Sequence, residues 1–229
     1  MTPTLSPAGK HLHIAIIPDG NRRWAKERNL HPWKGHEQAT ENFRTLTEWC
    51  LQSPDVAILT VWCFSTENWK RDPKEIAELM SMLERYLRKE RKGFTEKKTR
   101  FCHSGRRDRI PPTLAKLIAD VEEETKEKAA FTLHLAVDYG GKDEVIRAIE
   151  RVNGKATDES IRSCLDHPEL SDIDLIVRTS GEQRTSNFCL WQSTYAEWEF
   201  SPKYFPDFTA DDLAQAIEHF HERKRRFGA

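Results

Sequence analysis

The stretch His13-Ile14-Ala15-Ile16-Ile17-Pro18-Asp19-Gly20-Asn21-Arg22-Arg23-Trp24-Ala25 contains an abrupt change of residue pattern. An apolar run of the length of one buried strand stops at Pro18-Asp19-Gly20, and a helix-compatible segment follows at 21–29. The free N–H groups of a first helical turn and the helix dipole both favour negative charge. Asp19 adds a carboxylate that could share Mg²⁺ with a phosphate, and Arg23 adds a guanidinium. The stretch is compatible with a phosphorylated ligand and a metal ion, but taken alone it fits an ordinary turn capped by Asn21 at least as well.

The bulk composition is that of a globular protein. A chain of 229 residues is long enough for one large α/β domain, and two domains are less expected. With 38% hydrophobic and 32% charged residues, the chain does not belong to the disordered class. The formal net charge of −1 provides no general attraction for nucleic acid. Basic clusters at 100–109 and 223–226 are interpreted as solvated faces.

The cysteines and the N-terminal residues indicate a cytoplasmic protein. The five cysteines are widely spaced and show no metal-ligand pattern, so we expect free thiols in a reducing compartment. Residues 1–10 lack the apolar core of a signal peptide, and no segment approaches the length of a membrane span. We therefore expect a soluble protein with an N-terminal tail at 1–12 and one domain at 13–229. A peripheral contact with a membrane stays open.

Apolar runs alternate with stretches of helical periodicity. The expected strands are 12–17, 57–64, 99–103, 131–137 and 174–177. The expected helices are 37–51, 73–91, 112–127, 142–152, 158–165 and 210–225. This alternation predicts a central, mainly parallel sheet flanked by helices. Ligands of such folds collect at the carboxyl ends of the strands, so the chemically active residues should follow the strands.

Polar loops do follow the expected strands, at 65–71, 138–141 and 178–187. Arg178, Arg184 and Ser186 form a set suited to a diphosphate, because guanidinium groups bind phosphate oxygens bidentately and a hydroxyl adds a donor. A single arginine is more often part of a surface ion pair. Several such loops at one edge of a sheet favour a composite site.

A second anionic pocket is expected around the turn at Asp19. Arg23, His36 and Arg71 could line it beside the helix that begins at Asn21. Asp19, together with Glu197, could bind Mg²⁺. Two phosphate sites and one or two carboxylates predict transfer chemistry between two phosphorylated substrates.

The order of these motifs resembles that of the cis-prenyltransferases, the undecaprenyl diphosphate synthase family. The resemblance covers nearly the whole chain, from about His13 to Gly228. The matching blocks are Asp19-Gly20-Asn21 with Arg23-Trp24-Ala25, Gly35-His36, Phe64-Ser65-Thr66-Glu67-Asn68-Trp69 with Arg71, Tyr139-Gly140-Gly141, Arg178-Thr179-Ser180-Gly181-Glu182-Gln183-Arg184 with Ser186-Asn187-Phe188, the residues Trp191-Gln192, Tyr195, Glu197 and Phe200, and the ending Arg226-Phe227-Gly228.

The resemblance implies a fold, an activity and an assembly. The fold is a single α/β domain with a hydrophobic tunnel for the growing chain. The activity is Mg²⁺-dependent condensation of isopentenyl diphosphate with an allylic diphosphate, farnesyl diphosphate first and geranyl or geranylgeranyl diphosphate as alternatives. The product is a Z-polyprenyl diphosphate such as undecaprenyl or decaprenyl diphosphate, or a shorter Z-prenyl diphosphate. The resemblance also implies a homodimer and a possible membrane contact during product release.

The resemblance also implies residue roles. Those expected to bind the allylic diphosphate are Gly20, Asn21, Arg22, Arg23, Trp24, His36 and Arg71. Those expected to bind isopentenyl diphosphate are Arg178, Arg184 and Ser186, with Arg226 and Gly228 reaching the site of the other subunit. Those expected near the reacting atoms are Asp19, Asn21, Ser65 and Asn68. Asp19 and Glu197 would bind Mg²⁺. Those expected along the tunnel are Trp62, Phe64, Leu83 and Phe131.

The chain departs from the family pattern at three positions. Arg22 stands where relatives commonly have glycine, Pro18 stands for methionine, and Pro32 stands for a phosphate-binding arginine. The departures at Arg22 and Pro32 concern the allylic half of the site, so its affinity is less well predicted than that of the isopentenyl half. Two other interpretations fit the sequence less well: a non-catalytic partner subunit, which would lack the Asp19 and arginine motifs, and a nucleic-acid-binding domain, which would have a basic pI and interleaved aromatic residues.

Overall fold

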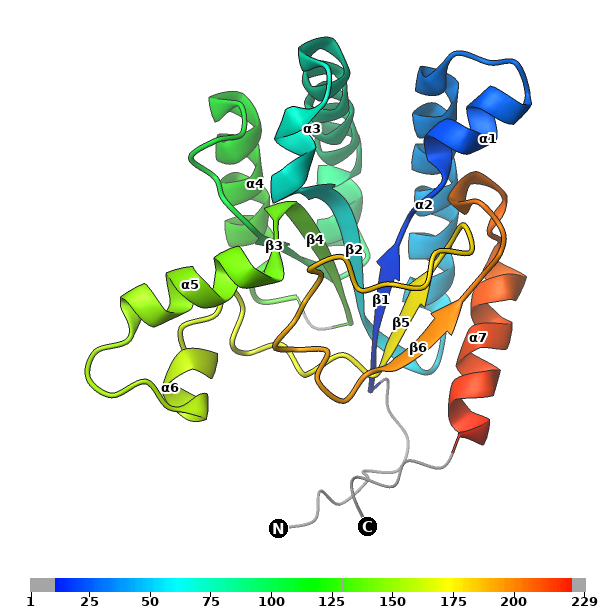
Figure 1. Cartoon of the computed structure of the whole chain (residues 1–229). Helices are drawn as coiled ribbons and strands as arrows, with labels where there is room; N and C mark the ends of the chain where they lie inside the picture. Colours follow the sequence, from blue (N-terminus) through cyan, green and yellow to red (C-terminus); the bar gives the residue numbers. More distant parts are fainter. Residues whose placement is uncertain (1–10, 129, 224–229) are drawn as a thin grey trace.

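A six-stranded parallel sheet forms the centre of the computed structural model, which describes residues 11–128 and 130–223 (Figure 1). The strand order is β3-β4-β2-β1-β5-β6, and every neighbouring pair is parallel. The strands are β1 (Leu12–Ile17), β2 (Val56–Ser65), β3 (Thr99–Ser104), β4 (Phe131–Tyr139), β5 (Leu175–Arg178) and β6 (Glu197–Phe200). The α-helices are α1 (Asn21–Glu27), α2 (Pro32–Gln52), α3 (Pro73–Glu96), α4 (Pro112–Thr125), α5 (Gly141–Arg151), α6 (Asp158–Arg162) and α7 (Ala210–Glu222). Two 3₁₀ turns, Thr66–Lys70 and Phe205–Asp207, complete the described elements.

Local sequence explains where the long helices begin. α3 starts at Pro73, where a missing N–H costs nothing, and the Asp72 side chain accepts from the backbone N–H of Lys74 at 2.8 Å. α7 is capped in the same way by Thr209. Proline at Pro32 likewise opens α2, which therefore begins before the expected residue 37.

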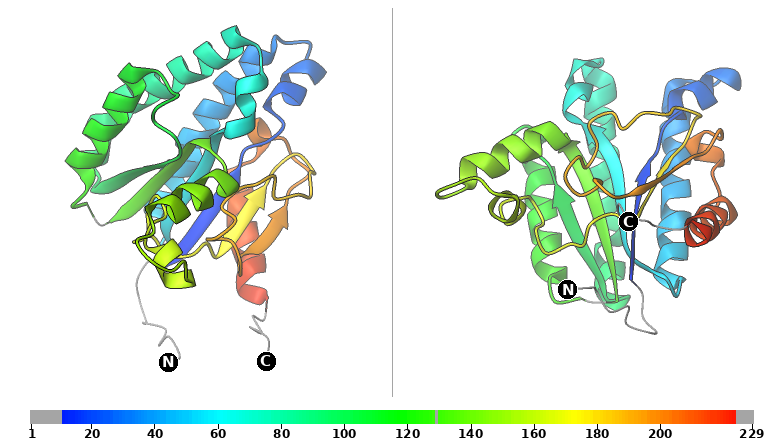
Figure 2. Two further views of the ribbon diagram at one scale, coloured as in Figure 1. Left: turned by 60° about the vertical axis from the view of Figure 1, so that its left-hand side comes forward. Right: turned by 60° about the horizontal axis from the view of Figure 1, so that its bottom comes forward.

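The sheet is covered on both faces. Helices α2, α3, α4 and α7 pack on one face, where residues such as Ile14 and Leu59 contribute to the larger core cluster. Helices α5 and α6 and the segments around β5 cover the other face, where Ala15 and Ile17 belong to a smaller cluster around Phe188 (Figure 2). The alternation of neighbouring β1 residues between the two clusters reflects the period of two along a strand. The predicted single α/β domain with a parallel sheet is confirmed.

β1 occupies the point where the connections reverse direction. After β1 the chain builds the sheet toward β2, β4 and β3, and it later returns to place β5 and β6 on the opposite side of β1. In open parallel sheets, the crevice outside the carboxyl ends of the strands at such a point is where ligands bind. The turn at Asp19 directly follows β1 and therefore lies at this crevice.

Two further details differ from the expected elements. β6 was not expected, because its sequence, Glu197-Trp198-Glu199-Phe200, is half-exposed throughout and lacks an apolar run. The expected helix 158–165 ends at Arg162. The boundary between an N-terminal tail and the domain stays a prediction, because residues 1–10 lie outside the described residues. None of the helices formed by the described residues is both long enough and apolar enough to span a membrane.

Candidate active site

A polar pocket of about 700 Å³ lies at the carboxyl ends of β1, β2 and β5. The residues lining it come from distant segments of the chain, and most of them were predicted from the sequence. The predicted residues that the pocket brings together are Asp19, Gly20, Asn21, Arg22, Arg23, His36, Trp62, Phe64, Ser65, Asn68, Arg71, Arg178 and Ser186. The post-strand loops 65–71 and 178–187 thus meet at one pocket, which residues 138–141 do not line, and the roles of the individual residues stay predictions.

Asp19 sits at the middle of the pocket's charged network. Its carboxylate accepts hydrogen bonds from the Gly20 backbone N–H at 2.6 Å, from Arg178 Nη2 at 2.9 Å and from Arg23 Nη2 at 3.2 Å. Burial raises the pKa of Asp19, but these bonds and the two positive charges outweigh it and hold the pKa below its usual value. The side chain is therefore a carboxylate, the form that binds a hard cation.

The turn that presents Asp19 requires glycine at the next position. Gly20 has a φ of 96°, in the left-handed region, and a Cβ there would lie 2.4 Å from Cδ1 of Tyr204. Gly20 precedes the first residue of α1, so the close packing on Tyr204 fixes the direction in which α1 leaves the sheet. The sequence Asp-Gly-Asn is thus explained by backbone geometry as well as by ligand binding.

Arg178 ends β5 and is almost completely buried. Its side chain is 4% exposed, and Nη1 donates to Ser186 Oγ at 2.8 Å and to the carbonyl oxygen of Arg184. Together with the bond to Asp19, these contacts aim the guanidinium at the pocket. Ser180, Ser186, Asn187 and Cys189 all have positive φ in the loop that follows. Such strain in non-glycine residues is typical of loops held in shape for a ligand.

A second group of positive residues surrounds Glu75 in the first turn of α3. The Glu75 carboxylate lies 3.3 Å from Arg71 Nη1, 3.8 Å from Arg22 Nη1 and 3.8 Å from His36 Nε2. Burial lowers the pKa of His36 to about 4, with a smaller opposing effect from Glu75, so its ring is neutral near pH 7. One carboxylate thus holds the three side chains that were predicted to bind a phosphate.

Several buried polar atoms of this pocket have no hydrogen-bond partner. Among the described residues, four buried side-chain atoms are unsatisfied: Asn21 Oδ1, His36 Nε2, Arg178 Nε and Gln192 Oε1. The first three belong to residues that line the pocket. Because native proteins satisfy the great majority of buried polar atoms, such a concentration indicates a site completed by a ligand.

An apolar cavity of about 100 Å³ adjoins the polar pocket. The two share Pro18, Asn21, His36, Cys63 and Leu79 as lining residues. Beyond these, the apolar cavity runs between α2, α3 and β2 and is lined by Phe43, Met82, Leu83 and Tyr86, among others. Phe43 and Tyr86 are in ring contact, with centroids 5.0 Å apart. The predicted tunnel residue Leu83 lies here, whereas Trp62 and Phe64 line the polar pocket.

Several predicted site residues lie elsewhere. Trp24 turns away from the pocket and donates from Nε1 to Asp207 at 2.8 Å, because α1 presents that face to the segment before α7. The Arg184 side chain is 58% exposed and pairs with Glu182. Phe131 is buried at the first residue of β4, at the opposite end of the sheet from the pocket. Arg226 and Gly228 lie outside the described residues.

Glu197 also lies apart from Asp19 within one chain. The strand register places Glu197 beside Leu175, which is level with Ile14 of β1. Asp19 lies about 15 Å further along the strand direction. Glu197 instead contacts Arg223 Nη1 at 3.3 Å. One chain alone therefore does not form the expected metal site of Asp19 and Glu197. Glu197 is the first residue of β6 and lies level with Ile14 in the middle of β1, whereas Asp19 lies beyond the carboxyl end of β1.

Two acidic residues of the site were missed. Glu75 stands four residues after Arg71 on the sequence, a spacing that could have identified it as a partner once α3 was placed. Glu182 contacts Arg23 Nη1 at 3.0 Å and also pairs with Arg184. Its position between two arginines depends on the path of the strained loop, for which the sequence gives no periodic signal.

Comparison with known proteins identifies the relatives of this chain. Residues 17–228 match the sequence model of the family described as "Putative undecaprenyl diphosphate synthase". The chain is 42% identical to the isoprenyl transferase of Wolinella succinogenes, over 94% of this chain and 96% of the relative. It is also 42% identical to the isoprenyl transferase of Thermotoga maritima, with the same two coverages.

Solved structures agree with these sequence matches. Lavandulyl diphosphate synthase from Lavandula x intermedia, in complex with dimethylallyl diphosphate, superposes with a TM-score of 0.90 at 31% identity, covering 95% of this chain and 98% of that one. A probable undecaprenyl diphosphate synthase from Campylobacter jejuni superposes with a TM-score of 0.82 at 34% identity, covering 96% of this chain and all of the other.

Proposed function

The chain belongs to the undecaprenyl diphosphate synthase family and is a cis-prenyltransferase, and from this premise we propose that it condenses isopentenyl diphosphate with an allylic diphosphate, farnesyl diphosphate in particular. The product would be a Z-polyprenyl diphosphate such as undecaprenyl or decaprenyl diphosphate. The observation that supports this proposal best is the concentration of unsatisfied buried polar atoms in the Asp19 pocket. Phosphate oxygens would accept from Arg178 Nε and from His36 when its Nε2 carries the hydrogen, whereas Asn21 Oδ1 is itself an acceptor and needs a donor.

The two halves of the pocket suit two diphosphates. Arg178 and Ser186, already aligned by their mutual hydrogen bond, would hold isopentenyl diphosphate. Arg184 would join them by turning its exposed side chain away from Glu182. The allylic diphosphate would lie against Gly20, Asn21 and the guanidinium groups around Glu75, namely those of Arg22 and Arg71, together with Arg23 and His36. Its negative charge would replace that of Glu75 on these side chains.

Asp19 fits a magnesium ion. Its carboxylate is ionised, half-buried and placed between the two groups of arginines, where the oxygens of both diphosphates would meet it. The ion would supply positive charge to the departing diphosphate. Glu197 of the same chain lies too far away to share that ion with Asp19. We therefore propose Asp19 as the metal ligand of this pocket.

In the chemical step, the side chains would mainly stabilise charge and orient the substrates. The bond between the allylic carbon and its diphosphate oxygen breaks, and the isopentenyl double bond supplies the electron pair of the new carbon–carbon bond. The isopentenyl unit then loses a proton, which a phosphate oxygen of a substrate would accept. Arg23 and Arg71 would stabilise the charge that develops on the leaving diphosphate. Asn21, Ser65 and Asn68 line the pocket and would orient the two substrates. The Asn68 side chain is itself held in place, because its Oδ1 accepts from the Ser65 backbone N–H at 3.1 Å.

The apolar cavity would receive the growing chain. Its residues Leu83 and Tyr86 project from α3, and Phe43 and Tyr86 narrow it. A short-chain Z-prenyl diphosphate synthase is the second candidate, favoured by the small volume of this cavity, about 100 Å³. The structural similarity to a synthase solved with dimethylallyl diphosphate is consistent with that candidate.

We also propose a homodimer that works in the cytoplasm and meets a membrane surface during product release. Exposed apolar side chains on α5 and in the segment before β6 support self-association: Ile146, Ile149, Leu190 and Tyr195. All five cysteines are free thiols, in keeping with a reducing compartment. Light scattering of wild-type protein and of Ile146→Asp would test the dimer, which predicts twice the chain mass for the first protein and a lower mass for the second.

Product analysis tests the proposed reaction and its chain length. Purified protein is supplied with Mg²⁺, labelled isopentenyl diphosphate and geranyl, farnesyl or geranylgeranyl diphosphate, and the dephosphorylated products are separated by chain length. Long Z-polyprenols would support the first candidate, and products extended by one or two units would support the second. Leu83→Trp should shorten the products and Tyr86→Ala should lengthen them, while equal products from both variants would exclude the cavity as the tunnel.

A further inference from the structure

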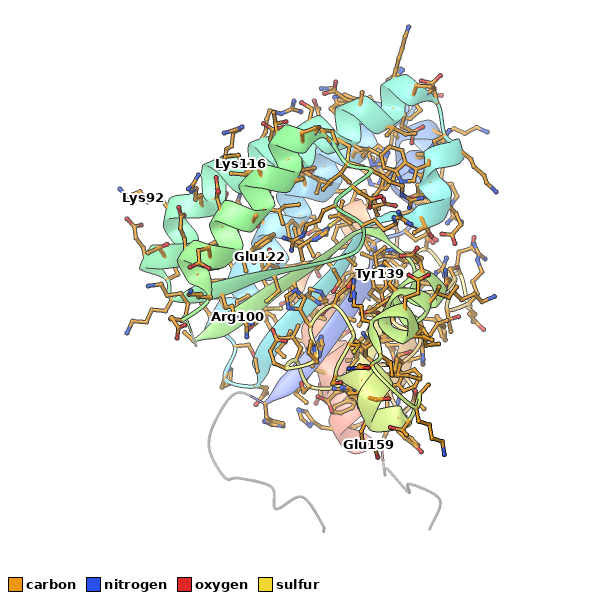
Figure 3. The ribbon with its side chains drawn as sticks, turned by 90° about the vertical axis from the view of Figure 1, so that its left-hand side faces the viewer. Lys92, Arg100, Lys116, Glu122, Tyr139 and Glu159 are labelled. Carbon is orange, nitrogen blue, oxygen red and sulfur yellow. The ribbon has the colours of Figure 1, made fainter. Side chains whose placement is uncertain are left out.

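A second cluster of ligand-type side chains lies at the β3 edge of the sheet, apart from the Asp19 pocket. Ligand atoms of Cys102, His167 and Glu169 all lie within 4.8 Å of one another. Cys102 is 1% exposed on β3, His167 is half-buried and Glu169 is exposed. Figure 3 shows this edge, with Arg100 on β3 and Glu122 on α4 labelled. The cluster is thus anchored in the core and reachable from solvent.

The histidine of the cluster is already oriented for a metal ion. His167 Nε2 lies 3.1 Å from the backbone carbonyl oxygen of His103, and Nδ1 lies 3.1 Å from Glu169 Oε1. The carbonyl and carboxylate oxygens both accept, so both ring nitrogens donate in the metal-free protein, and a metal ion would take the place of the Nδ1 hydrogen between His167 and Glu169 while Nε2–H keeps its carbonyl partner. Metal-binding histidines commonly donate their other ring N–H to a backbone carbonyl in this way.

Both acidic and basic side chains surround the cluster. Glu122 Oε1 lies 3.7 Å from His167 Nε2, and Glu169 is paired with Arg100. A metal ion bound here would therefore compete with Arg100 for the Glu169 carboxylate.

We propose that Cys102, His167 and Glu169 bind a transition-metal ion of the zinc class, which joins the edge strand β3 to the segment between α6 and β5. A thiolate, an imidazole and a carboxylate match the ligand preference of zinc, with water in the fourth position. Ligand atoms of a tetrahedral zinc site are about 3.5 Å apart, so the three side chains need to close by about 1 Å. Binding one divalent ion releases the proton of the Cys102 thiol and that of the His167 imidazolium.

Cobalt(II) provides a direct probe, because a thiolate ligand produces a near-ultraviolet charge-transfer band that oxygen and nitrogen ligands do not. The full-length protein, freed of metal with a chelator, is titrated with Co²⁺ and then with Zn²⁺. We expect one equivalent of Co²⁺ to produce the band and Zn²⁺ to remove it. Cys63 also lines the Asp19 pocket, so Cys63→Ser serves as a control: it should leave the band intact, which keeps the result independent of the proposed reaction.

Matched variants decide the assignment. Cys102→Ser should remove the band. Cys164→Ser changes a cysteine in the segment that contains His167 and Glu169 but outside the cluster, and it should leave the band intact. Glu169→Gln, at an exposed position that does not endanger folding, should weaken Co²⁺ binding about 10-fold or more. A wild-type titration without the band, or a band that persists in Cys102→Ser, would overturn the proposal.

Discussion

Two polar pockets of this molecule contain similar sets of arginines but satisfy them differently. In the β3-edge pocket, of about 870 Å³, Arg147 binds both oxygens of Asp166 and Arg107 pairs with Glu122. In the Asp19 pocket, three buried atoms have no hydrogen-bond partner: Arg178 Nε, His36 Nε2 and Asn21 Oδ1. The arginines of the first pocket have protein carboxylates as partners, and the second pocket leaves both donor and acceptor atoms for a ligand to satisfy.

The difference separates charges that stabilise the fold from charges that bind substrate. A buried ion pair that is complete on both sides contributes structure, and breaking it leaves an unpaired charge. Buried polar groups without partners lower the stability of the ligand-free protein, and a ligand that pairs with them restores that stability when it binds. Equivalent substitutions in the two pockets should therefore have opposite consequences for activity and stability.

The largest effect is expected for Asp19→Asn. Loss of the carboxylate removes the proposed metal ligand at the centre of the pocket, so turnover should fall by about 100- to 1,000-fold. Asp166→Asn in the β3-edge pocket should leave turnover unchanged and lower the free energy of unfolding, because Arg147 loses its partner. Steady-state kinetics and urea unfolding of both variants measure this contrast. Comparable losses of activity in the two variants would contradict it.

A pair of arginine substitutions should produce a smaller but sharper contrast. Lysine cannot reproduce the bidentate geometry of a guanidinium, so Arg178→Lys should lower kcat/KM for isopentenyl diphosphate by about 10- to 100-fold. Arg147→Lys should keep that kcat/KM and destabilise the fold by about 1–3 kcal/mol. If Arg178→Lys behaved like Arg147→Lys, the charges of the Asp19 pocket would be structural.

The pH dependence of stability should report on satisfied polar groups. His13 Nδ1 donates to the Ser171 carbonyl at 2.8 Å, and its Nε2 accepts from Thr60 at 2.6 Å, so the ring is neutral when this chain of bonds is intact. Burial lowers the pKa of His13 from 6.5 to about 4. The unfolded chain therefore takes up the proton first, and stability is lost as the pH falls from 6.5 toward 4.

The measurement is the urea midpoint between pH 7 and pH 4. His13→Gln should lower the midpoint at pH 7 and reduce its dependence on pH in this window, because one group that binds protons only when unfolded is gone. An unchanged pH dependence would show that His13 is not the group responsible.

The smallest effect is expected for His36→Gln. The His36 ring has the same lowered pKa, about 4, but its Nε2 has no hydrogen-bond partner. Its removal should cost little stability and should raise the KM for the allylic diphosphate by a few-fold, about the worth of one hydrogen bond. A large loss of stability with an unchanged KM would show that His36 supports the fold, as His13 does, and does not bind the allylic diphosphate.

Much of the fold was predictable because its signals are local. Buried strands such as Leu12–Ile17 are continuous apolar runs, and the helices between them show clear periodicity. β6 was missed because an edge strand with half-exposed residues carries no such run. The order of motifs along the chain then placed the polar loops at the carboxyl ends of the strands, where the structure has them.

The site was less completely predictable because its contacts join distant segments. Motif order identified Asp19, Arg178 and Ser186, which meet in the pocket. It could not show that the Arg184 side chain pairs with Glu182, or that Trp24 turns toward Asp207. Those outcomes depend on loop paths and side-chain directions that have no sequence period.

Incorporation of labelled isopentenyl diphosphate in the presence of farnesyl diphosphate tests the central claim most directly. The account predicts that wild-type protein makes longer Z-isoprenoid diphosphates with Mg²⁺, that a chelator stops the reaction, and that Asp19→Asn nearly abolishes it. No incorporation with geranyl, farnesyl or geranylgeranyl diphosphate, or full activity in Asp19→Asn, would contradict the assignment of this pocket as the site of condensation.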